Sequence, residues 1–278
     1  MKRKKHIFFD LDGTLLNSHH EIAKENLEII EKLKDDGFGI SIATGRSISM
    51  AINYINQLKL VDPVVLSNGT FILYPLEKKI KVVGKQVPYF VKKYFVNYLR
   101  NHGGTMTWFT EKQDYVYSTS YSGDLVLEYS TNLIDFSGKP LADLEEYLLK
   151  TRIYQLTLVY SGVDIVKDRP LSLVTEEFKE LENNNICKIT NTSNIFIDAN
   201  DLNTDKVNAI KVILQELSID ENDVFVFGDS NNDLGMIKYF SNSVAMANAS
   251  EAVKESAKEV IGNNNTTTIA EYLIGKFY

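Results

Sequence analysis

Two aspartates lie two positions apart near the start of the chain. Asp10 and Asp12 directly follow the short apolar run His6–Phe9. Two carboxylates this close repel each other unless a cation or a shared proton relieves the repulsion. A hard divalent cation such as Mg²⁺ prefers carboxylate oxygens together with water and phosphate. A carboxylate can also attack phosphorus, while a neighbouring carboxyl group protonates the leaving oxygen and then activates water.

Two other interpretations of this pair exist. Two nearby aspartates often belong to a turn in which they have a capping role, and this interpretation stays open at this point. A calcium loop is the other, because several residues fall at the liganding positions of an EF-hand loop: Asp10, Asp12, Thr14 and Glu21. Leu15 stands where that loop requires glycine, and the preceding run favours a strand rather than a helix. The calcium loop is therefore set aside.

A second acidic cluster, Gly228-Asp229-Ser230-Asn231-Asn232-Asp233, also follows an apolar run. Asp229 and Asp233 can supply further metal ligands or orient them. The alternative is that Asp229 or Ser230 caps the helix predicted to begin near Asp233. The two roles are compatible with each other.

Two further features suit a phosphate group. Thr44-Gly45-Arg46 ends a predicted strand and precedes a helix, where a hydroxyl and backbone N–H groups form a natural phosphate seat. Lys206 begins a predicted helix after a strand, and its ammonium can neutralise a phosphate as a point charge. The simpler alternative for a lone lysine is a solvated surface position.

All of these residues follow predicted strands. The first part of the chain alternates strands with helices, and this alternation predicts a parallel α/β sheet. Its strands are predicted at His6–Phe9, Phe38–Ala43 and Pro63–Leu66. Ligands bind such sheets at the carboxyl ends of the strands, and several polar residues fall there: Asp10, Asp12, Thr44, Asn68 and Asp229.

The alternation stops after about Thr70 and returns with a predicted strand at Asn194–Asp198. Between them, strands and helices no longer alternate one for one, which indicates an α+β module. We therefore predict a Rossmann-like doubly wound parallel-sheet core, residues 1–83 and 189–278, split by an inserted α+β cap, residues 84–188. The cap holds ten of the fifteen tyrosines. Packing is the simpler interpretation of each ring, so none is assigned to a substrate.

Composition excludes several classes of protein. The chain of 278 residues has a net charge of −7, which argues against nucleic-acid binding. Its one cysteine, Cys187, cannot form an intramolecular disulfide, and no apolar run is long enough for a membrane span. The apolar run after the basic start is too short for a signal peptide. We expect a cytoplasmic monomer or homodimer. The four histidines show no zinc-ligand spacing, and His19 and His20 are interpreted as loop residues.

Taken in order, four motifs resemble those of the haloacid dehalogenase-like superfamily of phosphotransferases. They are Asp10-Leu11-Asp12-Gly13-Thr14-Leu15, Ser41-Ile42-Ala43-Thr44-Gly45-Arg46, Lys206 and Gly228-Asp229-Ser230-Asn231-Asn232-Asp233. The long insertion is similar to the cap of the type IIB branch, the Cof-type phosphatases. Two further stretches are similar to that branch, Ser67-Asn68-Gly69-Thr70 and Met246-Ala247-Asn248-Ala249. One departure is Val207, where the branch often has glycine.

The resemblance implies a role for each matching residue. Asp10 would be the nucleophile and a metal ligand, and Asp12 the general acid/base, with its backbone carbonyl on the metal. Asp229 would bind Mg²⁺, and Asp233 would support the metal shell. The substrate phosphate would be held by Thr44, the Gly45 backbone, Lys206 and Asn232.

The implied activity is that of a Mg²⁺-dependent phosphomonoester hydrolase that works through an aspartyl-phosphate. Its substrate would be a small soluble metabolite, such as a sugar phosphate or a phosphorylated cofactor like pyridoxal phosphate or flavin mononucleotide (FMN). One alternative is a phosphomutase resembling phosphomannomutases, which a bisphosphate requirement would reveal. The other is a noncatalytic sensor of a phosphorylated ligand, which the presence of all four aspartates disfavours.

Overall fold

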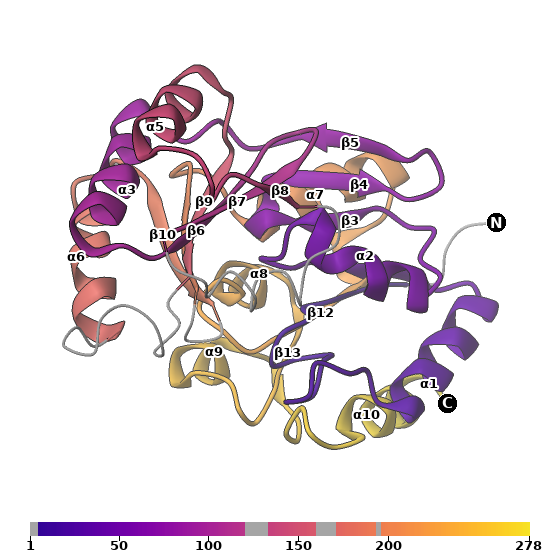
Figure 1. Ribbon diagram of the computed structural model, residues 1–278. Helices are drawn as coiled ribbons and strands as arrows, with labels where there is room; N and C mark the ends of the chain where they lie inside the picture. Colours follow the sequence, from indigo (N-terminus) through magenta and orange to yellow (C-terminus); the bar gives the residue numbers. More distant parts are fainter. Residues whose placement is uncertain (1–4, 120–132, 160–170, 193–195) are drawn as a thin grey trace. The chain divides into compact units, whose positions relative to one another are not determined.

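The computed structural model describes residues 5–119, 133–159, 171–192 and 196–278 (Figure 1). The chain forms two compact units. The first comprises Met1–Gly45, Ile52–Val83 and Asp205–Tyr278, and the second comprises Arg46–Ala51 and Gly84–Thr204. Three of the ten tyrosines counted above, Tyr121, Tyr129 and Tyr160, lie outside the described ranges. Within those ranges, no helix is long and apolar enough to cross a membrane.

The first unit is built on a five-stranded parallel sheet with the strand order β14-β13-β12-β1-β2. Its strands are β1 (His6–Phe9), β2 (Gly39–Ile42), β12 (Val224–Gly228), β13 (Asn242–Ala245) and β14 (Glu259–Val260). Every residue of β1, β2 and β12 is buried. A parallel sheet that is covered on both faces needs continuous apolar strands, and these runs meet that need.

Helices cover both faces of this sheet. On one face, α1 (Lys24–Asp35) and α10 (Thr268–Phe277) lie side by side (Figure 1), and Phe277 packs edge-on against Phe225. On the other face, Phe8 and Val226 share an apolar cluster with three helices. These are α7 (Lys206–Leu217), α8 (Leu234–Tyr239) and α9 (Glu251–Ser256). The doubly wound core is therefore confirmed.

A small antiparallel sheet follows the second parallel strand. It contains β3 (Val64–Leu66), β4 (Phe71–Tyr74) and β5 (Lys79–Val82), and a 3₁₀ turn, η1 (Ser67–Gly69), joins its first two strands. The N–H group of Thr44 donates to the Val65 carbonyl at 3.0 Å. This bond sets the end of β2 beside β3, so the turn at Ser67–Gly69 lies near the carboxyl ends of the parallel strands.

The second unit contains a six-stranded sheet with the order β10-β11-β9-β6-β7-β8. Its strands are β6 (Thr105–Phe109), β7 (Asp114–Ser118), β8 (Ile134–Asp135), β9 (Gln155–Val159), β10 (Lys188–Thr192) and β11 (Phe196–Asn200). Helices α3 (Tyr89–His102), α5 (Leu141–Lys150) and α6 (Leu171–Asn183) pack on one face (Figure 1). Trp108 is fully buried there and stacks on Tyr115, next to Tyr147. These rings pack in the core of the second unit, as expected from the packing interpretation of the tyrosines.

The boundary between the units differs from the sequence prediction. We predicted that the core resumes at residue 189, but β10 and β11 extend the second unit and the first unit resumes at Asp205. A short apolar run does not reveal which strand it pairs with, and β11 pairs antiparallel with β9.

The first turn of α2 (Ile48–Gln57) also belongs to the second unit. There the N–H group of Ser49 donates to a carboxylate oxygen of Asp114, on β7, at 3.2 Å. Burial raises the pKa of Asp114, while hydrogen bonds from Ser49 and Ser47 lower it. A buried carboxyl group thus binds this helix start to the second unit.

We predict different costs for alanine at two glycines of the first unit. Gly37 has a φ of +86° and open space where the methyl group of an alanine would lie, so Gly37→Ala meets only backbone strain and costs about 1–2 kcal/mol. At Gly69, with a φ of +102°, a Cβ atom would lie 2.2 Å from the Asp205 carbonyl oxygen. Gly69→Ala is expected to cost at least about 2 kcal/mol more. Urea unfolding followed by far-ultraviolet circular dichroism measures the free energy of unfolding of both variants. Equal losses would contradict the close contact between Gly69 and Asp205.

Candidate active site

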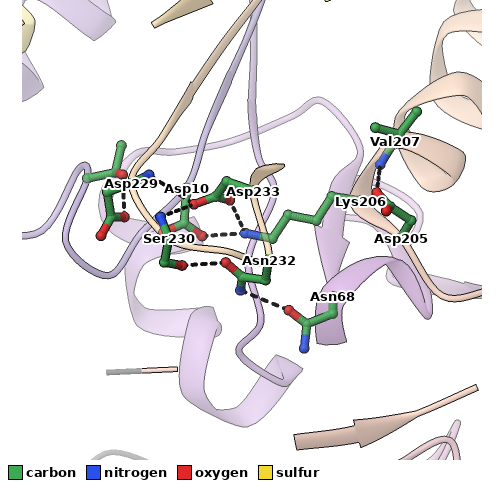
Figure 2. A network of polar contacts seen from close by, with 10 residues as sticks. Asp10, Asn68, Asp205, Lys206, Val207, Asp229, Ser230, Asn232 and Asp233 are labelled. Carbon is green, nitrogen blue, oxygen red and sulfur yellow. Dashed lines mark hydrogen bonds and ion pairs between the residues drawn. The ribbon is translucent and has the colours of Figure 1, made fainter. Parts of the chain in front are cut away.

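Three predicted aspartates meet at the carboxyl ends of two adjacent strands (Figure 2). Asp10 follows β1, and its N–H group donates to the Phe227 carbonyl of β12 at 3.0 Å. Asp229 directly follows β12, and Asp233 lies in the same loop, just before α8. Each of the three carboxylates offers an oxygen, and these oxygens lie within 4.8 Å of one another. The parallel pairing of β1 with β12 therefore brings together carboxylates that are far apart in the sequence.

Lys206 lies among these carboxylates. Its Nζ atom is 2.7 Å from Oδ1 of Asp10 and 2.6 Å from Oδ1 of Asp233 (Figure 2), and its side chain is fully buried. The surface alternative for this lysine is thus wrong. Burial by itself would lower the pKa of Lys206, but Asp10 and Asp233 outweigh it and raise this pKa above its ordinary value. The side chain is a buried ammonium.

The start of α7 determines where this ammonium lies. Asp205 is the N-cap, and its side chain accepts the Val207 N–H at 2.9 Å. A Cβ atom at Gly235 would lie 2.7 Å from the Asp205 carboxylate, so α8 closely abuts this cap. Val207, the departure from the family pattern, does not displace Lys206. Its N–H group completes the cap, and its side chain joins the apolar cluster beneath the sheet.

Asp233 has both carboxylate oxygens engaged. Oδ1 accepts the Lys206 ammonium, and Oδ2 accepts the backbone N–H groups of Asp229 and Ser230, each at 3.0 Å. The capping interpretation of Asp229 and Ser230 is wrong, because α8 begins at Leu234 with Asp233 as its N-cap and with no side-chain cap bond. Instead, the N–H groups of Asp229 and Ser230 donate to the Asp233 side chain, so Asp233 orders the loop that carries Asp229.

The aspartates leave this site with an excess of negative charge. Burial raises the pKa of Asp10 well above its ordinary value; Lys206 opposes this shift, and Asp233, Asp229 and Asp12 add to it. Burial also raises the pKa of Asp229 to about 7, with a further contribution from Asp233. Hard oxygen ligands under mutual repulsion are the donor set that a divalent cation prefers. The residues present therefore fit such an ion.

The predicted phosphate-binding residues are joined by Asn68. Its N–H group donates to the Thr44 carbonyl at 3.1 Å, and its Oδ1 accepts Nδ2 of Asn232 at 3.0 Å (Figure 2). A Cβ atom at Gly45 would lie 2.9 Å from the same Oδ1, so a side chain there would crowd this bond. Asn68 was predicted to lie at a strand end, but its link between Thr44 and Asn232 was not. Its signal was asparagine before glycine in a turn, and Asn68 has a φ of +57°, which asparagine tolerates.

Asp12 lies beside His20, a residue that we had predicted to belong to a loop. Oδ1 of Asp12 is 3.7 Å from Nδ1 of His20, and the Asp12 side chain is 14% exposed. Among the described residues, the group of carboxylates suited to a metal contains Asp10, Asp229 and Asp233 but not the Asp12 side chain.

We predict that Lys206→Met destabilises the protein at neutral pH. Removing one partner of a buried ion pair leaves uncompensated carboxylates, at a cost of about 3–5 kcal/mol. The cost should be smaller at pH 5 than at neutral pH, because burial raises the pKa of Asp10 and this carboxyl group binds a proton more readily as the pH falls. Denaturant unfolding at both pH values tests this. The control is Lys211→Met on the same helix, where Lys211 lies over the Tyr239 ring and a small cost is expected. Equal costs for the two variants would contradict the prediction.

We predict a pH dependence of stability for the metal-free protein. A carboxyl group whose pKa is raised on folding binds its proton more tightly in the folded state. The contribution of Asp229 is therefore complete below its ordinary pKa and is lost as the pH rises toward about 7. Between about pH 5 and pH 8, the free energy of unfolding should fall about 2 kcal/mol further in the wild type than in Asp229→Asn. Thermal unfolding in a chelator measures both slopes, and identical slopes would refute the assignment.

Comparison with known proteins agrees with this geometry. The chain is 28% identical over 267 residues to the 5-amino-6-(5-phospho-D-ribitylamino)uracil phosphatase YcsE of Bacillus subtilis, covering 96% of this chain and 93% of that protein. It is 25% identical to the pyridoxal phosphate phosphatase YbhA of Escherichia coli, over 96% of each chain. Its fold is similar to that of the HAD subclass IIB sugar phosphatase BT4131, with a TM-score of 0.79 at 21% identity over 98% of each chain.

A family model extends this agreement over nearly the whole sequence. The model of the haloacid dehalogenase-like hydrolases matches residues 7–273, which include every motif discussed above. Within this range, the aspartates that follow β1 and β12 and the lysine that begins α7 are brought together in one buried cluster. The chain therefore belongs to the haloacid dehalogenase-like hydrolase family.

Proposed function

We propose that this protein is a Mg²⁺-dependent phosphomonoester hydrolase that works through an aspartyl-phosphate on Asp10. The observation that carries the proposal is the buried ammonium of Lys206 in contact with Asp10, inside a cluster of three carboxylates. Such a cluster has a nucleophile, a fixed positive charge and the ligands for a cation. The similarity to known phosphatases along nearly the full chain supports this assignment.

Asp10 and Asp12 would divide the chemistry between them. Lys206 engages Oδ1 of Asp10, and the other carboxylate oxygen attacks phosphorus. The bond from phosphorus to the ester oxygen breaks, and the leaving oxygen takes the proton of the Asp12 carboxyl group. In the second half, the Asp12 carboxylate removes a proton from water, which attacks phosphorus. The bond to Asp10 then breaks, and inorganic phosphate and the free carboxylate result.

The cation would be held by Asp10, Asp229 and the backbone carbonyl of Asp12. Asp233 supports these ligands rather than binding directly, because the ammonium and two backbone N–H groups already use both of its oxygens. When bound, Mg²⁺ supplies positive charge that offsets the charge of the transferring phosphoryl oxygens.

The phosphoryl group would contact Lys206 and the loop formed by Thr44 and Gly45. Asn68 holds that loop beside Asn232, whose amide nitrogen carries two hydrogens and uses one for Asn68. Preorganised donors of this kind stabilise charge without reorganising at the moment of reaction. The affinity for phosphate would thus come from these nearby donors and not from the overall charge of the chain, which is −7.

The substrate we propose is a small phosphorylated metabolite, either a sugar phosphate or a phosphorylated cofactor. Two relatives support this class, since their names give pyridoxal phosphate and a phosphorylated ribitylamino-uracil as the compounds they act on. Both compounds are small phosphate monoesters.

Phosphate release tests the proposal. The assay offers an aryl phosphate, sugar phosphates and pyridoxal phosphate with Mg²⁺ and with chelator, and we expect wild type to release phosphate only with Mg²⁺. Asp10→Asn keeps the size of the side chain but removes the nucleophile, so the rate should fall by at least about 10³-fold. Asp35→Asn, which removes one exposed carboxylate from the end of α1, serves as the control and should keep wild-type activity. Undiminished release by Asp10→Asn would disprove the mechanism.

A further inference from the structure

A short turn after β13 is bound on both sides to the end of β12. The N–H group of Met246 donates to the Gly228 carbonyl at 3.2 Å, and that of Ser250 donates to the Asp229 carbonyl at 2.9 Å. A bond of 2.9 Å from the Ala249 N–H group to the Met246 carbonyl closes the turn. The turn is therefore fixed relative to Asp229, and its central side chain, Asn248, extends from a rigid support.

Asn248 binds the loop that follows the two N-terminal aspartates. Its Nδ2 donates to the Gly13 carbonyl at 2.7 Å, and its Oδ1 accepts the Asn264 N–H group at 3.0 Å. Asn264 in turn donates from Nδ2 to the Leu16 carbonyl at 2.8 Å. Asn264 and Asn248 thus hold the main chain of residues 13–16 at the Gly13 and Leu16 carbonyls.

Gly13 is held from a second side by Asp229. A Cβ atom at Gly13 would lie 2.3 Å from Oδ2 of Asp229, and the hydroxyl of Thr14 donates to Oδ1 of Asp229 at 2.8 Å. The φ of Gly13 is +77°. Glycine adopts this conformation without strain, but it adopts other conformations just as readily. Contacts from neighbouring groups must therefore select this conformation. Asn248 supplies one of them through the carbonyl of Gly13.

We propose that Asn248 is a positioning residue for the divalent cation of the proposed phosphatase. It fixes the peptide that follows Gly13, one residue after the Asp12 carbonyl, so that this carbonyl and the Asp229 carboxylate keep one relative arrangement. The inference rests on the proposed function, since the cation is the one assigned there. Groups that orient the ligands of a metal affect its affinity nearly as strongly as some ligands do.

Cation binding without turnover tests this role. Mn²⁺ is the probe, because electron paramagnetic resonance measures its free concentration over the metal-free protein. Asn248→Ala should weaken Mn²⁺ binding about tenfold relative to wild type. Asn265→Ala is the matched control, because Asn265 is also an exposed asparagine that binds the same loop, but through the Ser18 N–H group at 2.8 Å. It should bind Mn²⁺ as tightly as the wild type does.

The outcomes separate this inference from the proposed function. Weaker binding in Asn248→Ala alone, with thermal midpoints equal in the two variants, supports the positioning role. Binding within twofold of wild type in Asn248→Ala, or equal weakening in both variants, overturns it and leaves the proposed function standing. Absence of Mn²⁺ binding by wild type would overturn the proposed cation site, and the inference with it.

Discussion

The buried ammonium of Lys206 must be balanced by carboxylates, and the first unit is built so that these carboxylates lie next to it. It contacts Asp10 and Asp233 with no solvent around it, so each partner would be an uncompensated charge without the others. Burial raises the pKa values of Asp10 and Asp229, and the neighbouring carboxylates raise them further, although Lys206 supplies a positive charge. Under the proposed function, a divalent cation would offset the charge of these carboxylates and so allow an anionic phosphate to bind beside them.

The fold holds this cluster together because segments of the backbone approach one another closely. The pairing of β1 with β12 brings the two acidic motifs together, and the Asp205 cap sets the first residue of α7 against them. At Gly69, a methyl group would meet the backbone of Asp205, and at Gly228 it would meet the side chain of Asp233. These contacts leave little freedom for the strand ends to separate. The geometry of the charges is therefore a property of the packed sheet rather than of flexible loops.

Much of the first unit could be predicted from the sequence, because Asp10, Thr44 and Asp229 each follow an apolar strand. Parallel strands in a covered sheet are continuous apolar runs, and their carboxyl ends meet at one edge. The second unit was less predictable. Nothing local in Phe196–Asn200 reveals its antiparallel partners, and the helix at Leu141–Lys150 was not predicted at all. The stretches that contain Asn68 and Asn248 stood out in the sequence, but the contacts of these two side chains could not be predicted, because their partners lie far away in the sequence.

The first turn of α2 has a consequence for dissecting this protein. Because Arg46–Ala51 belongs to the second unit and the rest of the helix to the first, the chain passes between the units four times rather than twice. The second unit is thus not a contiguous fragment. A polypeptide cut at residues 84 and 204 would lack Ser49 and leave the Asp114 carboxylate without the N–H group it accepts. Exchange of this insertion between relatives must therefore carry the six residues after Gly45 with it, or else replace Asp114.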